Sequence, residues 1–127
     1  MRRLLMCSIF REPAIILVVM YSLGMSMKKA THETDRSDVR AFEQIVNVGA
    51  ATAGDFKLLG FEKPQELIGQ DPEQLFTRLC KLTKCRQDPC VLDVFLATID
   101  YMNGNPPRPW WEYTDERKIR FEHLFAE

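Results

Sequence analysis

Residues 45–61 read IVNVGAATAGDFKLLGF, and this stretch decides the fold. The apolar run at 45–48 stops at Gly49, and the small residues at 50–53 then open a new helix, which Gly60 ends. Small side chains at a helix start let two helices cross closely. They also leave the first N–H groups of the helix open to an anion, which the positive end of the helix dipole favours. The stretch therefore predicts a helix-hairpin-helix element, which binds nucleic-acid backbone without reading bases.

Residues 37–46 predict the helix that enters this hairpin. Ser37 or Asp38 can cap it, because both side chains accept hydrogen bonds from amides of a first helical turn. Its apolar stripe, at i, i+3, i+6 and i+7, consists of Val39, Phe42, Ile45 and Val46.

Prolines mark the next three helix starts. Pro64 opens a short helix that Gly69 breaks. Asp71-Pro72 and Asp88-Pro89 each join a capping carboxylate to a proline at the first helical position. The helix from Cys90 to Met102 is the most apolar in the chain.

The C-terminal part predicts one more helix. The sequence NGNPP at 103–107 ends the apolar helix, and Trp110 and Trp111 follow it. Thr114 or Asp115 can cap a charged helix that runs to about Phe125.

These patterns predict an all-α fold without strands. The segments VNVGAATAGDF and LIGQDPEQLF share a form, since each runs from an apolar helix end through Gly into a new helix start. We expect a compact bundle of five or six short helices built on two helix-hairpin-helix elements, similar in shape to a sterile-alpha-motif domain. Residues 37–127 form this domain, residues 28–36 a polar linker and residues 1–27 an N-terminal extension.

The extension imitates a signal peptide, with MRRLL ahead of the apolar run 14–23. Charged and proline residues at 11–13 interrupt it, and about ten apolar residues are too few to cross a bilayer. We interpret it as a miscalled start, with Met25 or Met27 as the true one. A signal or anchor segment and a packed helix are the alternatives.

The region from Arg40 to Lys118 resembles the helix-hairpin-helix family of pathogenicity-locus or mitomycin-resistance proteins, which are small bacterial proteins. The motifs that carry the resemblance are NVGAATAGDFKLLGF, LIGQDPEQLFTRLC, DPCVLDVF and PWWEYTDERK. The resemblance implies a link to DNA damage or its repair. The hairpin of this family commonly has Gly before the apolar tip and Lys after the second Gly, whereas this chain has Asn47, Ala50 and Ala51 there.

Candidate nucleic-acid-binding residues fall into two groups. Backbone amides of the hairpin are one group, and basic side chains on and beyond the next helices are the other, since each phosphate contact adds affinity through counterion release. The residues are Asn47, Val48, Gly49, Ala50, Ala51, Thr52, Lys57, Arg78, Lys81 and Lys84. The alternative for both groups is structural, with a hairpin that only packs helices and a solvated basic helix face. At the second hairpin, Asp71 and Glu73 would repel phosphate and instead cap the helix.

Cys80, Cys85 and Cys90 do not have the spacing of a zinc site, and His32 and His123 lie far away in the sequence. We expect Cys80 and Cys90 to pack as small apolar side chains, and Cys85 to be the exposed thiol. Without Cys7, which a signal peptide would remove, the chain keeps an odd number of cysteines, which favours a reducing cytoplasm over a disulfide framework.

Charge and motifs narrow the function. The chain has 17 basic and 18 acidic residues, so any contact with nucleic acid must be local or shared with a partner. No catalytic triad, nucleotide-binding glycine loop or metal motif occurs, so we expect neither an enzyme nor a cofactor. The leading hypothesis is a cytoplasmic accessory protein that binds DNA backbone phosphates. The alternative is a protein-interaction module that binds an unidentified protein; we expect no membrane partner.

Overall fold

The computed structural model describes residues 28–125. Two Asp-Pro pairs begin the two longest helices in this part of the chain. In α4 (Pro72–Thr83) and α5 (Pro89–Met102), the capping carboxylates of Asp71 and Asp88 accept hydrogen bonds from the amides of Glu73 and Cys90. The caps satisfy amides that a helix start otherwise leaves without partners. Both predicted starts are confirmed.

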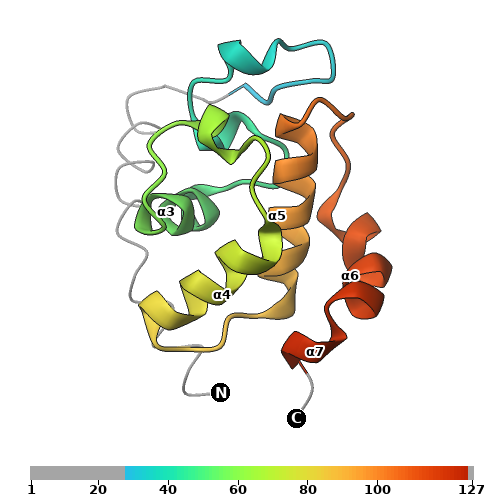
Figure 1. Ribbon diagram of the computed structural model, residues 1–127. Helices are drawn as coiled ribbons and strands as arrows, with labels where there is room; N and C mark the ends of the chain where they lie inside the picture. Colours follow the sequence, from blue (N-terminus) through green and yellow to red (C-terminus); the bar gives the residue numbers. More distant parts are fainter. Residues whose placement is uncertain (1–27, 126–127) are drawn as a thin grey trace.

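Helix α5 lies at the centre of the described fold (Figure 1). Helices α3 (Ala50–Leu58) and α4 lie on one side of it, and α6 (Thr114–Arg120) and α7 (Glu122–Phe125) on the other. Short 3₁₀ turns connect these helices: η1 Arg36–Asp38, η2 Phe42–Gln44, η3 Pro64–Leu67 and η4 Trp110–Tyr113. Residues 28–125 contain no strand, so the predicted all-α class is confirmed.

The core is centred on Phe56 of α3. Its ring stacks on Phe95 of α5 at a centroid distance of 5.1 Å and packs on Phe42 at 5.2 Å. All three side chains are buried, which removes apolar area from water and joins η2, α3 and α5 into one core.

The predicted helix over residues 37–46 is wrong. The chain there forms only the turns η1 and η2, with extended backbone at Val39 and Ala41. The buried residues Val39, Phe42, Ile45 and Val48 recur every three positions, which is the period of a 3₁₀ helix and not that of an α-helix. The side chain of Gln65 also donates to the carbonyl oxygens of Arg36 and Val39, so these groups have partners outside any local helix.

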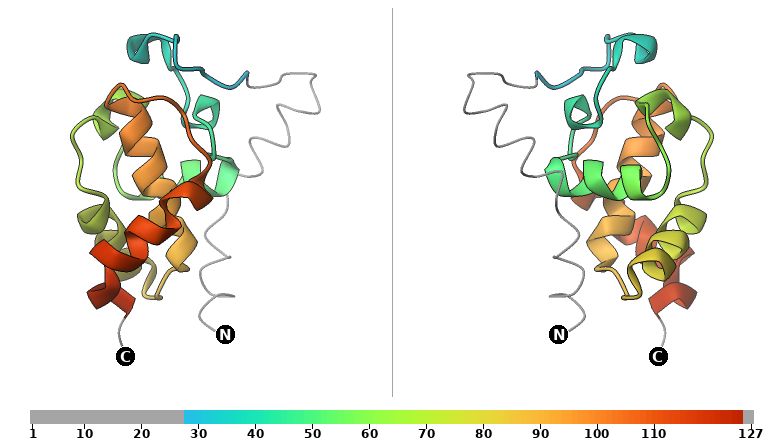
Figure 2. Two further views of the ribbon diagram at one scale, coloured as in Figure 1. Left: turned by 90° about the vertical axis from the view of Figure 1, so that its right-hand side faces the viewer. Right: turned by 90° about the vertical axis from the view of Figure 1, so that its left-hand side faces the viewer.

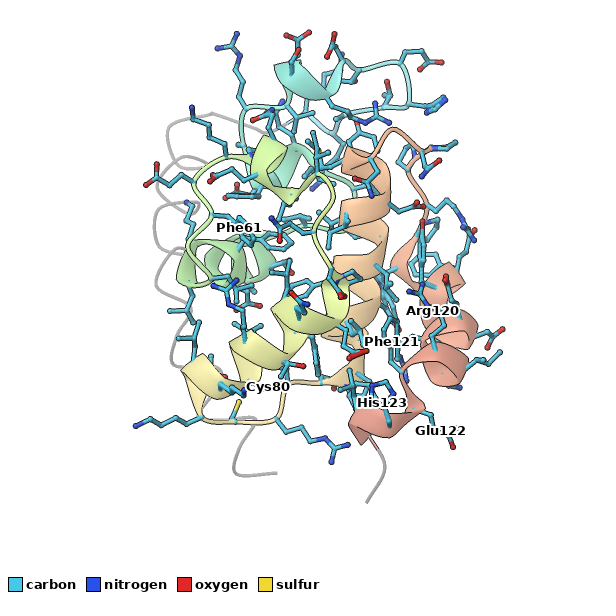
Figure 3. All side chains as sticks on the ribbon, in the orientation of Figure 1. Phe61, Cys80, Arg120, Phe121, Glu122 and His123 are labelled. Atoms are coloured by element: carbon cyan, nitrogen blue, oxygen red, sulfur yellow. The ribbon has the colours of Figure 1, made fainter. Side chains whose placement is uncertain are left out.

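The predicted C-terminal helix is present but divided. It breaks at the buried Phe121, which turns toward α5, while Glu122 points outward (Figure 3). Thr114 does not cap α6 as predicted, since its hydroxyl donates to Asp93 of α5 at 2.9 Å. Arg117 also donates to Asp93 at 2.9 Å, and the Asp93 side chain has no exposed area. This buried contact fastens the tail to the core.

No helix among residues 28–125 is long and apolar enough to span a bilayer. The interpretation of residues 1–27 lies outside the described part of the chain.

Candidate nucleic-acid interface

Two consecutive segments, which we call the first hairpin (residues 40–53) and the second hairpin (62–75), repeat one backbone structure with an offset of 22 residues. In each, a side-chain oxygen accepts from two preceding amides: Gln44 from residues 40 and 41, and Glu66 from residues 62 and 63. Three residues later the chain turns through positive φ, 77° at Asn47 and 76° at Gly69. A helix then begins three residues further on, at Ala50 and at Pro72.

The hydrogen bonds of the two turns also correspond. Val48 donates to the Ile45 carbonyl at 3.1 Å, and Gln70 donates to the Leu67 carbonyl at 3.2 Å. No residue is identical between the two segments when they are aligned at this offset. The duplication predicted from the shared form of the two segments is therefore present in the backbone, and its first helix is a 3₁₀ turn in both copies.

The two hairpins differ at the residue that precedes the helix. The second hairpin has Asp71 there, and its carboxylate accepts from the amide of Glu73 at 2.9 Å. The first hairpin has Gly49 there, which has no side chain that could cap α3. A Cβ built on Gly49 would have no atom within 4 Å, so there is space next to this position. An anion at this place has the favourable end of the α3 dipole before it.

The predicted hairpin residues do not all present a group to this opening. Val48 is buried and its amide is used within the turn. Ala51 has an interaction of its own. Gly49 is exposed, and Ala50 and Thr52 are half-buried, with amides that form no hydrogen bond inside residues 28–125. The amides of Ala50 and Thr52 are therefore the donors available to a ligand.

The side of the first hairpin that carries carbonyl groups is occupied by Lys29. Its ammonium donates to the carbonyl oxygens of Glu43 at 2.6 Å, Ile45 at 3.2 Å and Val48 at 2.9 Å. Partial burial lowers the pKa of this ammonium, and the charge of Glu43 opposes that change. Lys29 thus holds three carbonyl groups of the turn and, as a donor, does not bind its amides.

The predicted basic side chains lie toward the other end of α3. Lys57 is in its last turn, and Arg78 of α4 donates to the Leu59 carbonyl at 2.9 Å. With α3 nine residues long, these groups are roughly 13 Å from the helix start. The structure therefore places the amides and the basic side chains at opposite ends of one helix.

Lys81 and Lys84 line a groove at the end of α4, near Cys80 in Figure 3. The groove has a volume of about 530 Å³, with Phe76, Cys80 and Leu124 among its lining residues, and Arg86 adds a third basic side chain. No acidic residue lies between positions 74 and 87, although the chain as a whole has a slight excess of acidic residues. The groove is therefore a local basic surface suited to phosphate or another anion.

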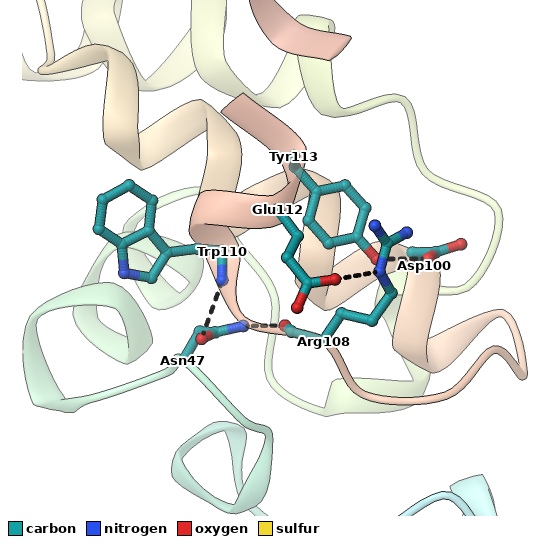
Figure 4. A network of polar contacts seen from close by, with 6 residues as sticks. All are labelled: Asn47, Asp100, Arg108, Trp110, Glu112 and Tyr113. Atoms are coloured by element: carbon teal, nitrogen blue, oxygen red, sulfur yellow. Dashed lines mark hydrogen bonds and ion pairs between the residues drawn. The ribbon is translucent and has the colours of Figure 1, made fainter. Parts of the chain in front are cut away.

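The Trp segment, residues 108–113, packs beside the first hairpin. The Asn47 side chain donates to the Arg108 carbonyl at 2.8 Å and accepts from the Trp110 amide at 3.2 Å (Figure 4). In Figure 2, left, η4 lies next to the start of α3. The Asn47 side chain therefore serves as a structural link and is not open to a ligand.

The outer side of the Trp segment is exposed. Trp111 is 62% exposed, and its ring meets that of Trp110 edge to face at 5.8 Å. Tyr113 is buried and its hydroxyl donates to Asp100, and burial is the main reason that the pKa of this phenol is raised. The prediction that one tryptophan faces inward and the other outward agrees with the half-buried Trp110 and the exposed Trp111.

The profile of the pathogenicity locus family matches residues 35–119. The chain belongs to this family. It is also 39% identical over 82 residues to "Mitomycin resistance protein McrB" from Streptomyces lavendulae, an alignment that covers 65% of this chain and 78% of that protein. No solved structure matches the chain.

Within residues 28–125 of this pathogenicity locus protein, no group of three or more His, Cys, Asp or Glu side chains could hold a metal ion. Cys85 is buried and disulfide-bonded, so the prediction of an exposed Cys85 thiol is wrong. The thiols of Cys80 and Cys90 are free and partly buried. Cys80 packs against the apolar core as expected, whereas the thiol of Cys90 lies beside the carboxylate of Asp88.

Sequence reasoning missed Lys29, Arg108 and Asp93. Lys29 and Arg108 belong to polar stretches that show no period, so nothing in the sequence brings them to the hairpin. Asp93 lies within the apolar helix 90–102, and a charged residue among apolar neighbours was a signal for a buried partner.

Proposed function

We propose that this protein is a non-catalytic accessory protein that binds the phosphate backbone of nucleic acid, DNA first of all, without reading its sequence. A phosphate would occupy the open place at Gly49 and accept from the amides of Ala50 and Thr52. The name of the similar Streptomyces protein supports a role of this binding in resistance to mitomycin.

The observation that carries the proposal is the difference between the two hairpins. In the second hairpin the carboxylate of Asp71 binds the amide of Glu73, the counterpart of Ala51. A phosphate at the first hairpin would bind the amides on either side of Ala51, those of Ala50 and Thr52. Gly49 supplies no carboxylate at the corresponding position, and α3 has no acidic residue in its first turn. An external anion can therefore take the place of a side-chain cap.

The basic groove supplies a second contact to the same backbone. Lys81 and Lys84 are exposed and form no ion pair within residues 28–125, so they can neutralise phosphates and release counterions. The lysines that the hairpin lacks at Ala50 and Ala51 are compensated by this surface in our proposal.

The test installs the cap of one hairpin in the other. Gly49 has φ −104°, which any residue adopts, and open space around a Cβ, so Gly49→Asp and the control Gly49→Ala should both fold. We expect Gly49→Asp to weaken binding to a labelled DNA duplex at least tenfold, because the new carboxylate occupies the position of the phosphate and repels it. Gly49→Ala should change the affinity less than about twofold. Fluorescence anisotropy measures both.

Salt dependence tests the groove. Affinity for the duplex should fall steeply as the salt concentration rises. The double variant with Lys81→Ala and Lys84→Ala should reduce the slope of log K against log salt by about 2. Absence of binding to DNA and RNA at low salt, or equal behaviour of Gly49→Asp and Gly49→Ala, contradicts the proposal.

A protein-interaction module is the second candidate. Ile119 on α6 is 80% exposed between Lys118 and Arg120, an unusual position for a branched apolar side chain. If nucleic acid does not bind, a photo-crosslinking residue at position 119 should yield a single, stoichiometric protein adduct, and one at the exposed position 62 of the second hairpin should not.

A further inference from the structure

The exposed indole of Trp111 has no part in phosphate binding as described above. It is the larger of the two most exposed apolar side chains within residues 28–125, at 62%. Tryptophan in the core or in a packed helix face is covered far more completely, so an indole held in water is suited to a flat, polarisable ligand.

The backbone that carries this indole is fixed. The amide of Trp110 is bound by Asn47, and the amide of Glu112 donates to the Pro109 carbonyl at 3.1 Å. On the inner side, Tyr113 is anchored in the core through Asp100. The segment that carries Trp111 is therefore already ordered by folding. A ligand that stacks on Trp111 need not offset the loss of conformational entropy of this segment.

The surroundings of Trp111 suit a phosphate-linked ligand. Its neighbour Glu112 is paired with Arg108 at 3.1 Å, and both side chains are almost half exposed. Such a surface pair contributes little, so Arg108 can exchange the carboxylate for a phosphate. Arg108 also lies over the ring of Tyr113 at 4.6 Å, which keeps its guanidinium beside the Trp segment.

We propose that Trp111 stacks on an unpaired base, so that the protein prefers nucleic acid with unstacked nucleotides over intact duplex. The hydrogen bonds of Asn47 join the segment that carries Trp111 to the first hairpin. On our proposal, one strand presents a phosphate to the hairpin and a nearby base to Trp111. This inference rests on the proposed function, because the phosphates bring the base to the indole. Stacking on an aromatic side chain tolerates every base, which is consistent with binding that does not read sequence.

The test separates bases from phosphates. The probes are a single strand of DNA of about 20 nucleotides, the same strand with abasic sugars throughout, an RNA strand of the same sequence and the DNA duplex. Wild-type protein should bind the single strand more tightly than the duplex and about five- to a hundredfold more tightly than the abasic strand. Trp111→Ala should bind the complete and the abasic strand equally, and Trp111→Phe should keep most of the preference.

Each outcome has one meaning. Equal binding of complete and abasic strands by the wild-type protein, or a preference that Trp111→Ala keeps, overturns the role of Trp111. If Gly49→Asp still weakens every probe in that case, phosphate binding stands and the stacking inference alone fails. If no probe binds at low salt, the proposed function itself fails. The DNA strand and the RNA strand are then compared for the affinity that each loses in Trp111→Ala. The larger loss shows whether the unpaired base belongs to DNA or to RNA.

Discussion

The side chain of Asn47 accepts a hydrogen bond from the amide of Trp110 at 3.2 Å, across 63 positions of sequence. The Nδ2 group of the Asn47 side chain donates to the Arg108 carbonyl, so one side chain joins the first hairpin to the Trp segment. Asn47 also has φ 77°, a conformation that asparagine tolerates better than most residues. Its backbone and its side chain thus serve two separate needs of the fold.

Substitution of Asn47 separates these needs. Asn47→Gly keeps the backbone conformation and removes both hydrogen bonds, so we expect a loss of about 1–2 kcal/mol in the free energy of unfolding. Asn47→Ala adds the strain of positive φ, about 1 kcal/mol more. Urea unfolding measures both variants. Equal stability of Asn47→Gly and wild type would show that the link to the Trp segment contributes nothing.

The buried pair of Asp93 and Arg117 predicts a large effect at the tail. Arg117→Met leaves the fully buried carboxylate of Asp93 with only Thr114 as partner, so we expect a loss of about 3–5 kcal/mol. Arg120→Met is the matched control, because the ion pair of Arg120 with Glu116 is exposed and should contribute less than about 1 kcal/mol. Thermal unfolding followed by circular dichroism distinguishes the two, and similar melting temperatures would contradict the assignment.

Glu66 predicts a sensitivity to acid. Hydrogen bonds from the amides of Lys63 and Glu62 lower the pKa of its carboxyl group. A lowered pKa means that this stabilisation is present above the pKa of the unfolded chain and is lost as pH falls through that of the folded protein. Gln44 performs the same function in the first hairpin without titrating. Glu66→Gln should therefore reduce the change in melting temperature between pH 7 and pH 3, and an unchanged difference would argue against this role.

Cys90 predicts a slow reaction with alkylating reagents. Burial first, and then the hydrogen bond and charge of Asp88, raise the pKa of its thiol to about 11. Only about one thiol in a thousand is then ionised at pH 8, and the thiolate is the reactive form. The rate of modification by iodoacetamide, followed by mass spectrometry of the Cys90 peptide, should rise about tenfold per pH unit from 8 to 10. A plateau near pH 9 would show an ordinary thiol.

Because the neutral thiol is the favoured form in the fold, stability should fall as pH rises from about 9 to 11.

The elements that local chemistry determines were predictable from sequence. An Asp-Pro pair has one good place in a helix, its start, and both pairs occur there. The segment 37–46 was mispredicted because Val39, Phe42 and Ile45 fit a helical stripe, whereas the backbone is extended at Val39 and Ile45 and forms only short 3₁₀ turns beside them.

The candidate site was harder to predict, because its groups meet through tertiary contacts. The open cap at Gly49 is visible in the sequence, but its meaning depends on the comparison with Asp71, and the two hairpins share no identical residue at the offset that aligns them. The contacts of Lys29 with Glu43, Ile45 and Val48 join a polar lead-in to a turn through backbone oxygens, which leave no trace in residue type.

Two hairpins with one hydrogen-bond pattern and no shared residues show that backbone contacts, and not residue identity, specify this turn. The residue before the helix can therefore differ while the turn is kept. Asp71 brings its own negative charge, so the second hairpin is self-sufficient, whereas Gly49 brings none, so in our proposal the first hairpin depends on what it meets. Exchange of these two residues would then transfer that dependence from one half of the molecule to the other.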